Sequence, residues 1–156
     1  MGQISVVCRS HAPAGAIRTR EASVHLTADD HAEIQRLYGQ YSQAIDLGSP
    51  DAFADVFTND AVLQTEMGDY AGREALKGFA TWFRGQMGTS VRHWPANLVV
   101  RAEADVVTAT CYFGAFQVGD PSGPKPIASG IYSDVLAKSG DGWKIASRNI
   151  AMDKPG

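Results

Sequence analysis

The chain has 156 residues, of which 44% are hydrophobic and 20% charged, and its formal net charge is −3. This length and composition indicate one soluble globular domain with a single core. The negative charge and the lack of a Lys/Arg cluster argue against nucleic-acid binding. No apolar run approaches the roughly 20 residues that cross a membrane. The only two cysteines, Cys8 and Cys111, predict independent free thiols in a reducing compartment, and so a cytoplasmic protein.

Residues 1–26 differ in composition from the rest of the chain. They contain Arg9, Arg18 and Arg20 and have no acidic residue before Glu21. We expect a flexible extension, or a tail docked on a partner subunit, ahead of a domain that spans residues 27–156. Their apolar run is too short for a secretory signal, and an organelle-targeting peptide is a minor alternative.

Helical signals occupy the first part of the domain. Thr27 is a typical N-cap, and an apolar stripe with helical spacing follows it. Gly48 is a natural end to this helix, and Ser49 with Pro50 predicts the start of a short second helix. A third helix is expected over residues 74–87. The first stripe consists of Ile34, Leu37, Tyr38, Tyr41 and Ile45.

Strand signals follow the second helix and dominate the chain after the third. Strands are expected over residues 61–67, 91–103, 106–118, 127–138 and 143–152, with tight turns near Ala104 and Gly140. This order predicts an α+β fold, in which a cone-shaped, curved antiparallel sheet wraps around the N-terminal helices. Such a sheet leaves a conical cavity that suits a small apolar ligand.

Four segments together resemble the SnoaL-like branch of the nuclear-transport-factor-2-like superfamily. They are residues 44–62, 72–74, 93–97 and 141–144, and the resemblance runs from about Ala32 to Ala151. It implies a cystatin-like α+β barrel that often forms a homodimer or a higher homo-oligomer through the outer face of its sheet. The superfamily includes dehydratases, isomerases, cyclases, dehydrohalogenases and non-catalytic subunits.

Three lyase types of this superfamily are similar to the chain at two positions. Scytalone dehydratase, bile-acid 7α-dehydratase and hexachlorocyclohexane dehydrochlorinase each have an Asp–His dyad in a hydrophobic cone. Asp46, at the end of the first helix, and His93, on the first long strand, match that dyad. Tyr41 matches an active-site tyrosine of the bile-acid enzyme, and Asn97 matches a position of the dehydrochlorinase pattern.

The chain also departs from these enzymes. The second histidine of scytalone dehydratase would fall near Phe116, and its serine and asparagine on a later strand would fall near Gly130 and Tyr132. A tyrosine that both dehydratases carry would fall near Thr65. The contacts that those side chains make to water or a leaving group are therefore not carried over.

The residues themselves suggest proton-transfer chemistry. Histidine is a base near neutral pH, and a carboxylate on its other ring nitrogen fixes the tautomer and stabilises the imidazolium. We expect His93 to be the base, Asp46 to orient it, and Tyr41 to donate a hydrogen bond to a developing oxyanion. The resulting hypothesis is a dehydratase-like lyase or isomerase that acts on a small apolar cyclic molecule, such as a polyketide, steroid or terpenoid intermediate. No cofactor or metal is expected, since the histidines are scattered.

Several other side chains are candidates for contact with the substrate. Strand alternation places His93, Asn97 and Val99 on one face unless Pro95 introduces a bulge. On the next strand, residues 112, 114 and 116 share one face, and the alternation does not say which face lines the cavity. The candidate substrate-binding residues are Tyr38, Trp82, Asn97, Tyr112, Phe116, Tyr132 and Arg148.

Two other classes of function remain open from the sequence. The first is a non-catalytic module of the same fold, either a small-ligand carrier or a subunit of an assembly. The second is a polyketide cyclase or an epoxide-opening enzyme, which would need another acid in the cone, and Glu66 and Asp134 are the candidates.

Overall fold

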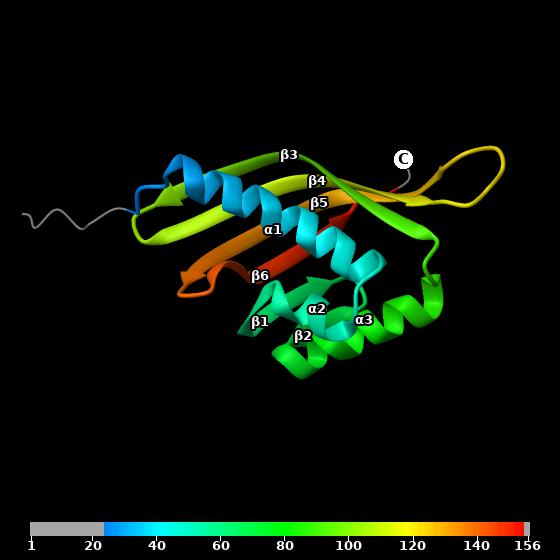
Figure 1. Cartoon of the computed structure of the whole chain (residues 1–156), viewed down its shortest axis with the longest axis horizontal. Coiled ribbons are helices and arrows are strands. Elements are labelled where there is room, and N and C mark those ends of the chain that lie inside the picture. The colour runs from blue at the N-terminus through cyan, green and yellow to red at the C-terminus, as the bar shows by residue number, and fades with distance from the viewer. Residues whose placement is uncertain (1–23, 155–156) are drawn as a thin grey trace, which may run out of the picture.

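The computed structural model of the chain describes residues 24–154, which form three helices and one six-stranded sheet (Figure 1). In the described part of the chain, no helix combines the length and the apolar character needed to cross a bilayer. The helices are α1 (Ala28–Asp46), α2 (Pro50–Asp55) and α3 (Arg73–Met87). The strands are β1 (Phe57–Thr65), β2 (Gly68–Ala71), β3 (Val91–Glu103), β4 (Val106–Gln117), β5 (Lys125–Ser139) and β6 (Gly142–Met152).

The start of α1 is fixed by local hydrogen bonds. The Thr27 hydroxyl accepts a bond from the Asp30 backbone N–H, and the Asp30 carboxylate accepts one from the Thr27 backbone N–H. This capping box satisfies two N–H groups that would otherwise lack partners. The predicted apolar stripe is buried, from Ile34 to Ile45. Ser49 caps α2 and Pro50 is its first residue, as predicted.

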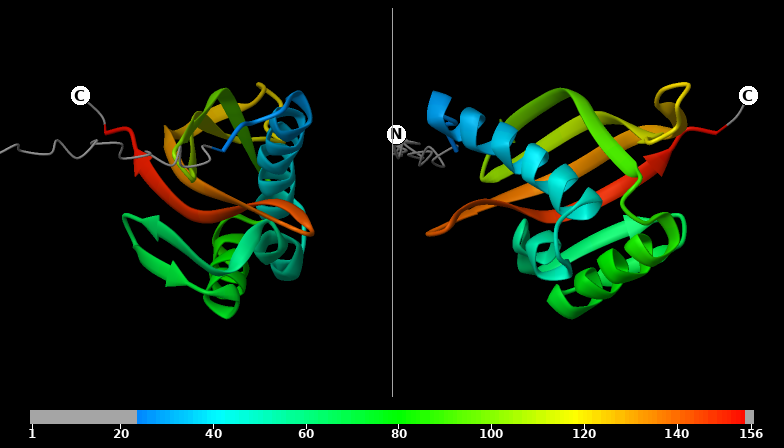
Figure 2. Two further views of the ribbon diagram at one scale, coloured as in Figure 1. Left: turned by 90° about the vertical axis from the view of Figure 1, so that its left-hand side faces the viewer. Right: turned by 45° about the vertical axis from the view of Figure 1, so that its right-hand side comes forward.

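The sheet has the strand order β2-β1-β6-β5-β4-β3 and is not closed into a barrel. Neighbouring strands are antiparallel except β1 and β6, which are parallel. Figure 2 shows that the sheet curves and that α1 crosses its concave side. The predicted α+β architecture is confirmed, and the parallel pair is an addition that strand patterns alone do not reveal.

A β-bulge in β3 changes which side chains face the core. Pairing is regular through Pro95, which lies opposite Phe113, and the register shifts between Ala96 and Val99. Asn97 has a φ of 57°, which is a left-handed conformation that asparagine tolerates. Because the bulge forms, Val99 is exposed and does not share a face with His93. Leu98 and Val100 are partly buried and pack on the core instead. The shared face of His93, Asn97 and Val99, expected only without a bulge, therefore does not form.

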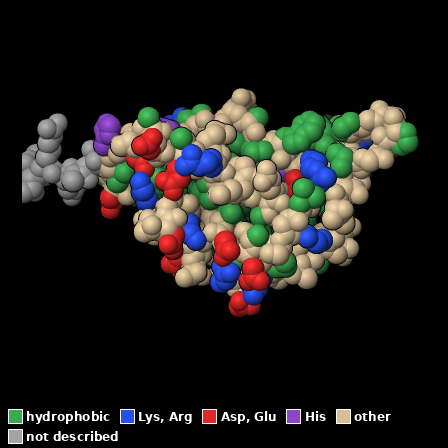
Figure 3. All heavy atoms as spheres, in the orientation of Figure 1, with side chains coloured by type: hydrophobic (Ala, Val, Ile, Leu, Met, Phe, Trp, Pro, Cys, Tyr) green, Lys and Arg blue, Asp and Glu red, His purple; other side chains and the backbone are tan. Residues whose placement is uncertain are grey.

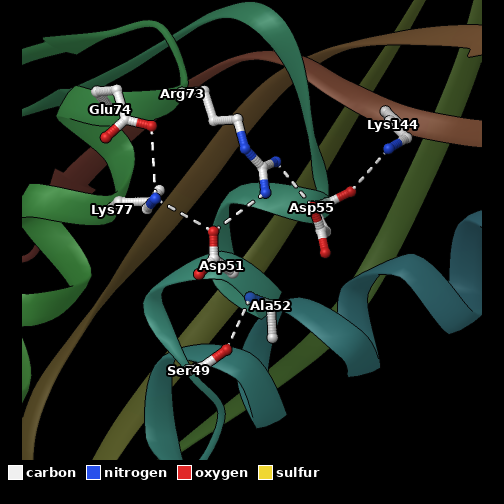
Figure 4. Close-up of polar contacts among 8 residues, drawn as sticks. All are labelled: Ser49, Asp51, Ala52, Asp55, Arg73, Glu74, Lys77 and Lys144. Atoms are coloured by element: carbon white, nitrogen blue, oxygen red, sulfur yellow. Dashed lines mark hydrogen bonds and ion pairs between the residues drawn. The ribbon is translucent and has the colours of Figure 1, made fainter.

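Helix α3 is attached to α2 by surface ion pairs (Figure 4). Arg73 binds Asp55 at 2.7 Å and Asp51 at 3.3 Å, and Lys77 binds Asp51 at 3.2 Å. The space-filling view shows charges of both signs intermixed over this helical part of the molecule (Figure 3). The buried side chains of α3 are Leu76, Phe79 and Ala80, so the helix also packs on the core.

The predicted N-terminal extension lies largely outside the described residues, since the structure describes the chain only from residue 24. The Val24 backbone N–H donates to the Ala104 carbonyl at 2.8 Å, and Val24 and Leu26 pack against the core. The chain is therefore in contact with the domain a few residues before α1 begins.

Candidate active site

Asp46 and His93 come together where the end of α1 meets the start of β3. Asp46 Oδ1 lies 2.6 Å from His93 Nδ1, and Asp46 Oδ2 accepts the His93 backbone N–H at 2.8 Å. Both oxygens of one carboxylate are thus engaged by one residue. A carboxylate only accepts hydrogen bonds, so Nδ1 carries a proton, and in the neutral imidazole Nε2 is then the acceptor nitrogen.

The surroundings of Asp46 are unfavourable for a charged carboxylate, so its bonds to His93 are needed to stabilise it. The residue is 5% exposed and is the last residue of α1, where the helix dipole opposes a negative charge. The two hydrogen bonds from His93 offset that cost because charge-assisted bonds are stronger than neutral ones. The Asp46 carboxylate is therefore fixed in position, and it fixes the imidazole in turn.

His93 forms part of the wall of a cavity of about 270 Å³. The rings of Phe83 and Phe113 lie beside the imidazole, with centroids 5.6 and 6.4 Å from it. The cavity is enclosed by α1, α3, the β1–β2 turn and strands β3 to β6. Its lining is mainly apolar, with hydroxyl groups from Tyr41, Tyr132 and Thr65 and one carboxylate, that of Glu66.

A buried arginine lies behind this cavity. Arg148 has no solvent exposure, and its guanidinium donates two hydrogen bonds to Asp134, at 2.8 and 2.6 Å. Tyr38 donates its hydroxyl to the same carboxylate. The guanidinium carbon lies 4.0 Å from the Tyr41 ring centre and 4.1 Å from that of Tyr132. Two side chains of the cavity wall are therefore held against a cation that does not itself line the cavity.

Burial keeps the tyrosines of this cluster protonated. It raises the pKa of Tyr41, an effect that the charge of Arg148 partly offsets, and it raises the pKa of Tyr132 well above the ordinary range. Burial opposes the charge of Arg148, yet the Asp134 carboxylate outweighs it and holds the pKa of Arg148 well above its usual value. At neutral pH the tyrosine hydroxyls are hydrogen-bond donors beside a permanent cation.

The structure brings some of the candidate residues to the cavity and leaves others away from it. His93, Tyr41, Tyr132 and Trp82 line the cavity, and Asp46 lies behind His93. Tyr38 and Arg148 lie behind the wall. Three candidates face away from it: Asn97 is exposed at the bulge, Tyr112 is 57% exposed, and Phe116 packs against Trp94 with 4.2 Å between ring centres.

The sequence reasoning missed several residues of the lining. On β4, Cys111, Phe113 and Ala115 are buried, whereas Tyr112 and Gly114 are not, so the inward face is the one with odd numbers. Alternation separates the two faces of β4. It could also have shown which one faces the core, because the odd-numbered face continues with the apolar residues Ala109 and Val107. Met67, Met87 and Met152 also line the cavity, and no sequence pattern connects these three distant residues.

A second, more open groove of about 680 Å³ lies between α1, α2 and the β5–β6 turn. Neither His93 nor Asp46 lines it, and its lining includes Leu37, Leu47 and Trp143. The smaller cavity is therefore the candidate active site, because proton-transfer groups and an enclosed apolar wall coincide there.

Comparisons with known proteins agree with this architecture. A family model of the SnoaL-like domain matches residues 26–149. A Nostoc punctiforme protein of unknown function with a cystatin-like fold is 22% identical, with a TM-score of 0.75 over 83% of this chain and 96% of that one. ActVI-ORFA from Streptomyces coelicolor is 24% identical, with a TM-score of 0.75 over 83% and 99%.

A Catenulispora acidiphila protein, whose structure is a complex with S-DNPA, is 29% identical. Its TM-score is 0.70, over 81% of this chain and 96% of that one. No curated protein matches the chain. The family match covers most of the sequence, and the similar structures share the fold with the α+β sheet described above. The chain belongs to the SnoaL-like family.

Proposed function

We propose that the protein is a dehydratase-like lyase or isomerase in which His93 removes a proton from carbon next to a carbonyl group. The observation that carries this proposal is the contact of 2.6 Å between Asp46 Oδ1 and His93 Nδ1 at the wall of an apolar cavity. In the neutral imidazole this contact places the proton on Nδ1 and leaves Nε2 as the acceptor that a general base requires.

In the proposed reaction, the C–H bond of the substrate breaks and its proton passes to Nε2 of His93. Asp46 stabilises the imidazolium that forms, and the Tyr41 hydroxyl donates a hydrogen bond to the enolate oxygen. In a dehydration, a C–O bond on the neighbouring carbon then breaks, a C=C bond forms, and the leaving hydroxide takes the proton from His93 as water. In an isomerisation, His93 returns the proton to another carbon. Acid–base groups suffice for either outcome, so the proposal includes no cofactor.

The cavity also supports a substrate of limited size. Its volume of about 270 Å³ lies just below the 300–1,000 Å³ that is typical of ligand pockets. A substrate with one or two rings fits that volume better than a four-ring steroid. Within the polyketide, steroid and terpenoid classes, we therefore favour small cyclic ketones.

Deuterium exchange tests the base without knowledge of the natural substrate. Indanone is a bicyclic ketone with exchangeable hydrogens beside its carbonyl group, and NMR in deuterated buffer follows their loss. We expect the protein to accelerate this exchange, and His93→Gln to lower the enzymatic rate about 10²- to 10⁴-fold. His31→Gln, on the exposed face of α1, is the matched control.

Asp46→Asn should lower the exchange rate to a similar extent for a specific reason. An amide has one acceptor oxygen, so satisfying the His93 backbone N–H places the amide N–H₂ against Nδ1. The imidazole must then carry its proton on Nε2, which removes the base. Asp29→Asn, an exposed change on α1, should leave the rate unaltered. Full activity in both site variants would show that the Asp46–His93 pair is not the base, whereas no acceleration by the natural protein would favour a non-catalytic binding module.

We also infer that the protein is a cytoplasmic homodimer joined through the outer face of its sheet. Tyr112 lies directly opposite Ile131 on that face, and both are exposed, as is Trp94. An exposed apolar group of this kind is typical of an interface. Light scattering after size-exclusion chromatography should give a dimer mass for the natural protein and a monomer mass for Ile131→Asp. Gln35→Asp, on the exposed face of α1, should remain dimeric, and a monomeric natural protein would contradict the inference.

A further inference from the structure

The mouth of the cavity contains a carboxylate that the proposed reaction does not use. Glu66 is exposed to solvent and lines the cavity together with Thr65 and Met67. Glu66 is the only Asp or Glu in the lining, because Asp46 lies behind His93 and Asp134 is buried beside Arg148. Among residues 24–154, no ion pair involves Glu66.

The β1–β2 turn holds Glu66 in place. Thr65 pairs with Gly68 across a two-residue turn, and Gly68 has a φ of 132°. The Thr65 hydroxyl donates to the Gly68 carbonyl at 3.0 Å and accepts the Met67 backbone N–H at 3.1 Å. These bonds occupy the Thr65 hydroxyl, so Glu66 is the polar group of the turn that remains open to a ligand.

Glu66 and His93 stand on different sides of the cavity. His93 is on the edge strand β3, and Glu66 follows β1, so β4, β5 and β6 separate them in the sheet. Adjacent strands are about 4.8 Å apart, and the curvature of the sheet turns its two sides toward the same cavity. A ligand that contacts both residues therefore crosses the apolar interior between them.

We propose that Glu66 is a specificity-determining residue that accepts a hydrogen bond from a hydroxyl group on the end of the substrate opposite the carbon at which His93 acts. This proposal rests on the proposed function, since it takes His93 as the reacting end. A carboxylate accepts hydrogen bonds and repels anions, so the site selects a hydroxyl-bearing ring over one that carries a methoxy or carboxylate group. The preferred substrate is then a small cyclic ketone, apolar in its middle, with a hydroxyl group at its far end.

Three indanones test this preference by isothermal titration calorimetry. They carry a hydroxyl, a methoxy or a carboxylate group on the aromatic carbon para to the one that bears the carbonyl. We expect the natural protein to bind the hydroxyl form about five- to tenfold more tightly than the methoxy form, because hydrogen bonds to charged groups are among the stronger ones. The carboxylate form should bind most weakly.

Glu66→Gln should reduce the hydroxyl preference to about twofold or less, since an amide also donates to methoxy and carboxylate oxygens. The same variant should bind the carboxylate form more tightly than the natural protein does. Asp69→Asn makes the same charge change on β2, outside the cavity lining, and should preserve all three affinities.

Equal binding of the hydroxyl and methoxy forms by the natural protein would overturn the assignment of Glu66. So would a hydroxyl preference that survives in Glu66→Gln, or a failure to bind any of the three ketones. These binding ratios do not depend on turnover. Unchanged deuterium exchange in the His93 and Asp46 variants would therefore refute the proposed base while the preference set by Glu66 persists.

Discussion

At the scale of single residues, Arg148 has the most demanding environment in the interior. Its guanidinium is fully buried, paired with Asp134 and enclosed by the rings of Tyr41 and Tyr132. Its Nη1 has no hydrogen-bond partner among the described residues. Such a charge is tolerated because its counter-charge is equally buried, so each member of the pair depends on the other.

Removal of one partner from this pair should therefore lower the free energy of unfolding more than removal of both. We expect Arg148→Met to lower the free energy of unfolding by about 3–5 kcal/mol, since Asp134 remains as a buried, unpaired charge. The double variant Arg148→Met with Asp134→Leu should recover part of that loss. Urea unfolding of the four proteins in the cycle measures the coupling, and additive losses would contradict a mutually dependent pair.

At the scale of elements, the pairing of β5 with β6 leaves no room for a side chain at Gly130. A Cβ added there would overlap the Ala151 carbonyl oxygen and would lie 2.8 Å from Phe113 Cε1. The Phe113 ring stacks on Tyr132 at 4.3 Å, and both line the cavity. The serine of scytalone dehydratase would fall near Gly130, where this sheet has no room for a side chain.

Gly130→Ala should consequently disturb both the sheet and the cavity wall. We expect a loss of about 1–3 kcal/mol in the free energy of unfolding, the usual cost of overpacking, and weaker binding of indanone. Gly85→Ala, on an open face of α3, should be neutral or stabilising by up to about 1 kcal/mol because alanine favours a helix. Thermal unfolding and calorimetry distinguish the two, and equal stability would show that β6 moves aside easily.

The elements also show what the sequence could predict. Thr27, Ser49 and Pro50 act through neighbouring backbone groups, so local patterns were enough to place the starts of α1 and α2. The bulge at Asn97 depends on how β3 pairs with β4, and single-strand alternation contains no such information. The parallel pairing of β1 with β6 joins strands far apart in sequence and was likewise not predictable.

The same distinction applies to the candidate site. The resemblance placed Asp46 and His93 at matching positions, and the structure brings their atoms together. Asn97 is a candidate through the resemblance as well as through strand alternation, and Phe116 is one through alternation. The bulge and the pleat turn both to the outside. Residues that meet through tertiary packing, such as Phe83 beside His93, leave no mark in the sequence pattern.

At the scale of the whole molecule, buried tyrosines make the stability of the fold depend on pH. Of the five tyrosines in the chain, Tyr38, Tyr41 and Tyr132 are buried around Arg148. Burial is the main cause that raises the pKa of each of the three. The folded protein therefore holds these three protons more tightly than the unfolded chain, in which tyrosine has a pKa of about 10.

This difference predicts an alkaline limit to stability. For groups whose pKa is raised by folding, the stabilisation is complete below about pH 10 and is lost as the pH rises toward the folded-state values. We expect part of the phenolate absorbance to appear only together with the loss of far-UV circular dichroism. In concentrated urea, all five tyrosines should ionise in one transition near pH 10, about the value of free phenols. Tyr132→Phe should reduce the phenolate signal that accompanies unfolding by one tyrosine. Complete ionisation with intact circular dichroism would mean that water reaches the Arg148 cluster in the folded protein, because only a solvated phenolate ionises there without unfolding the core.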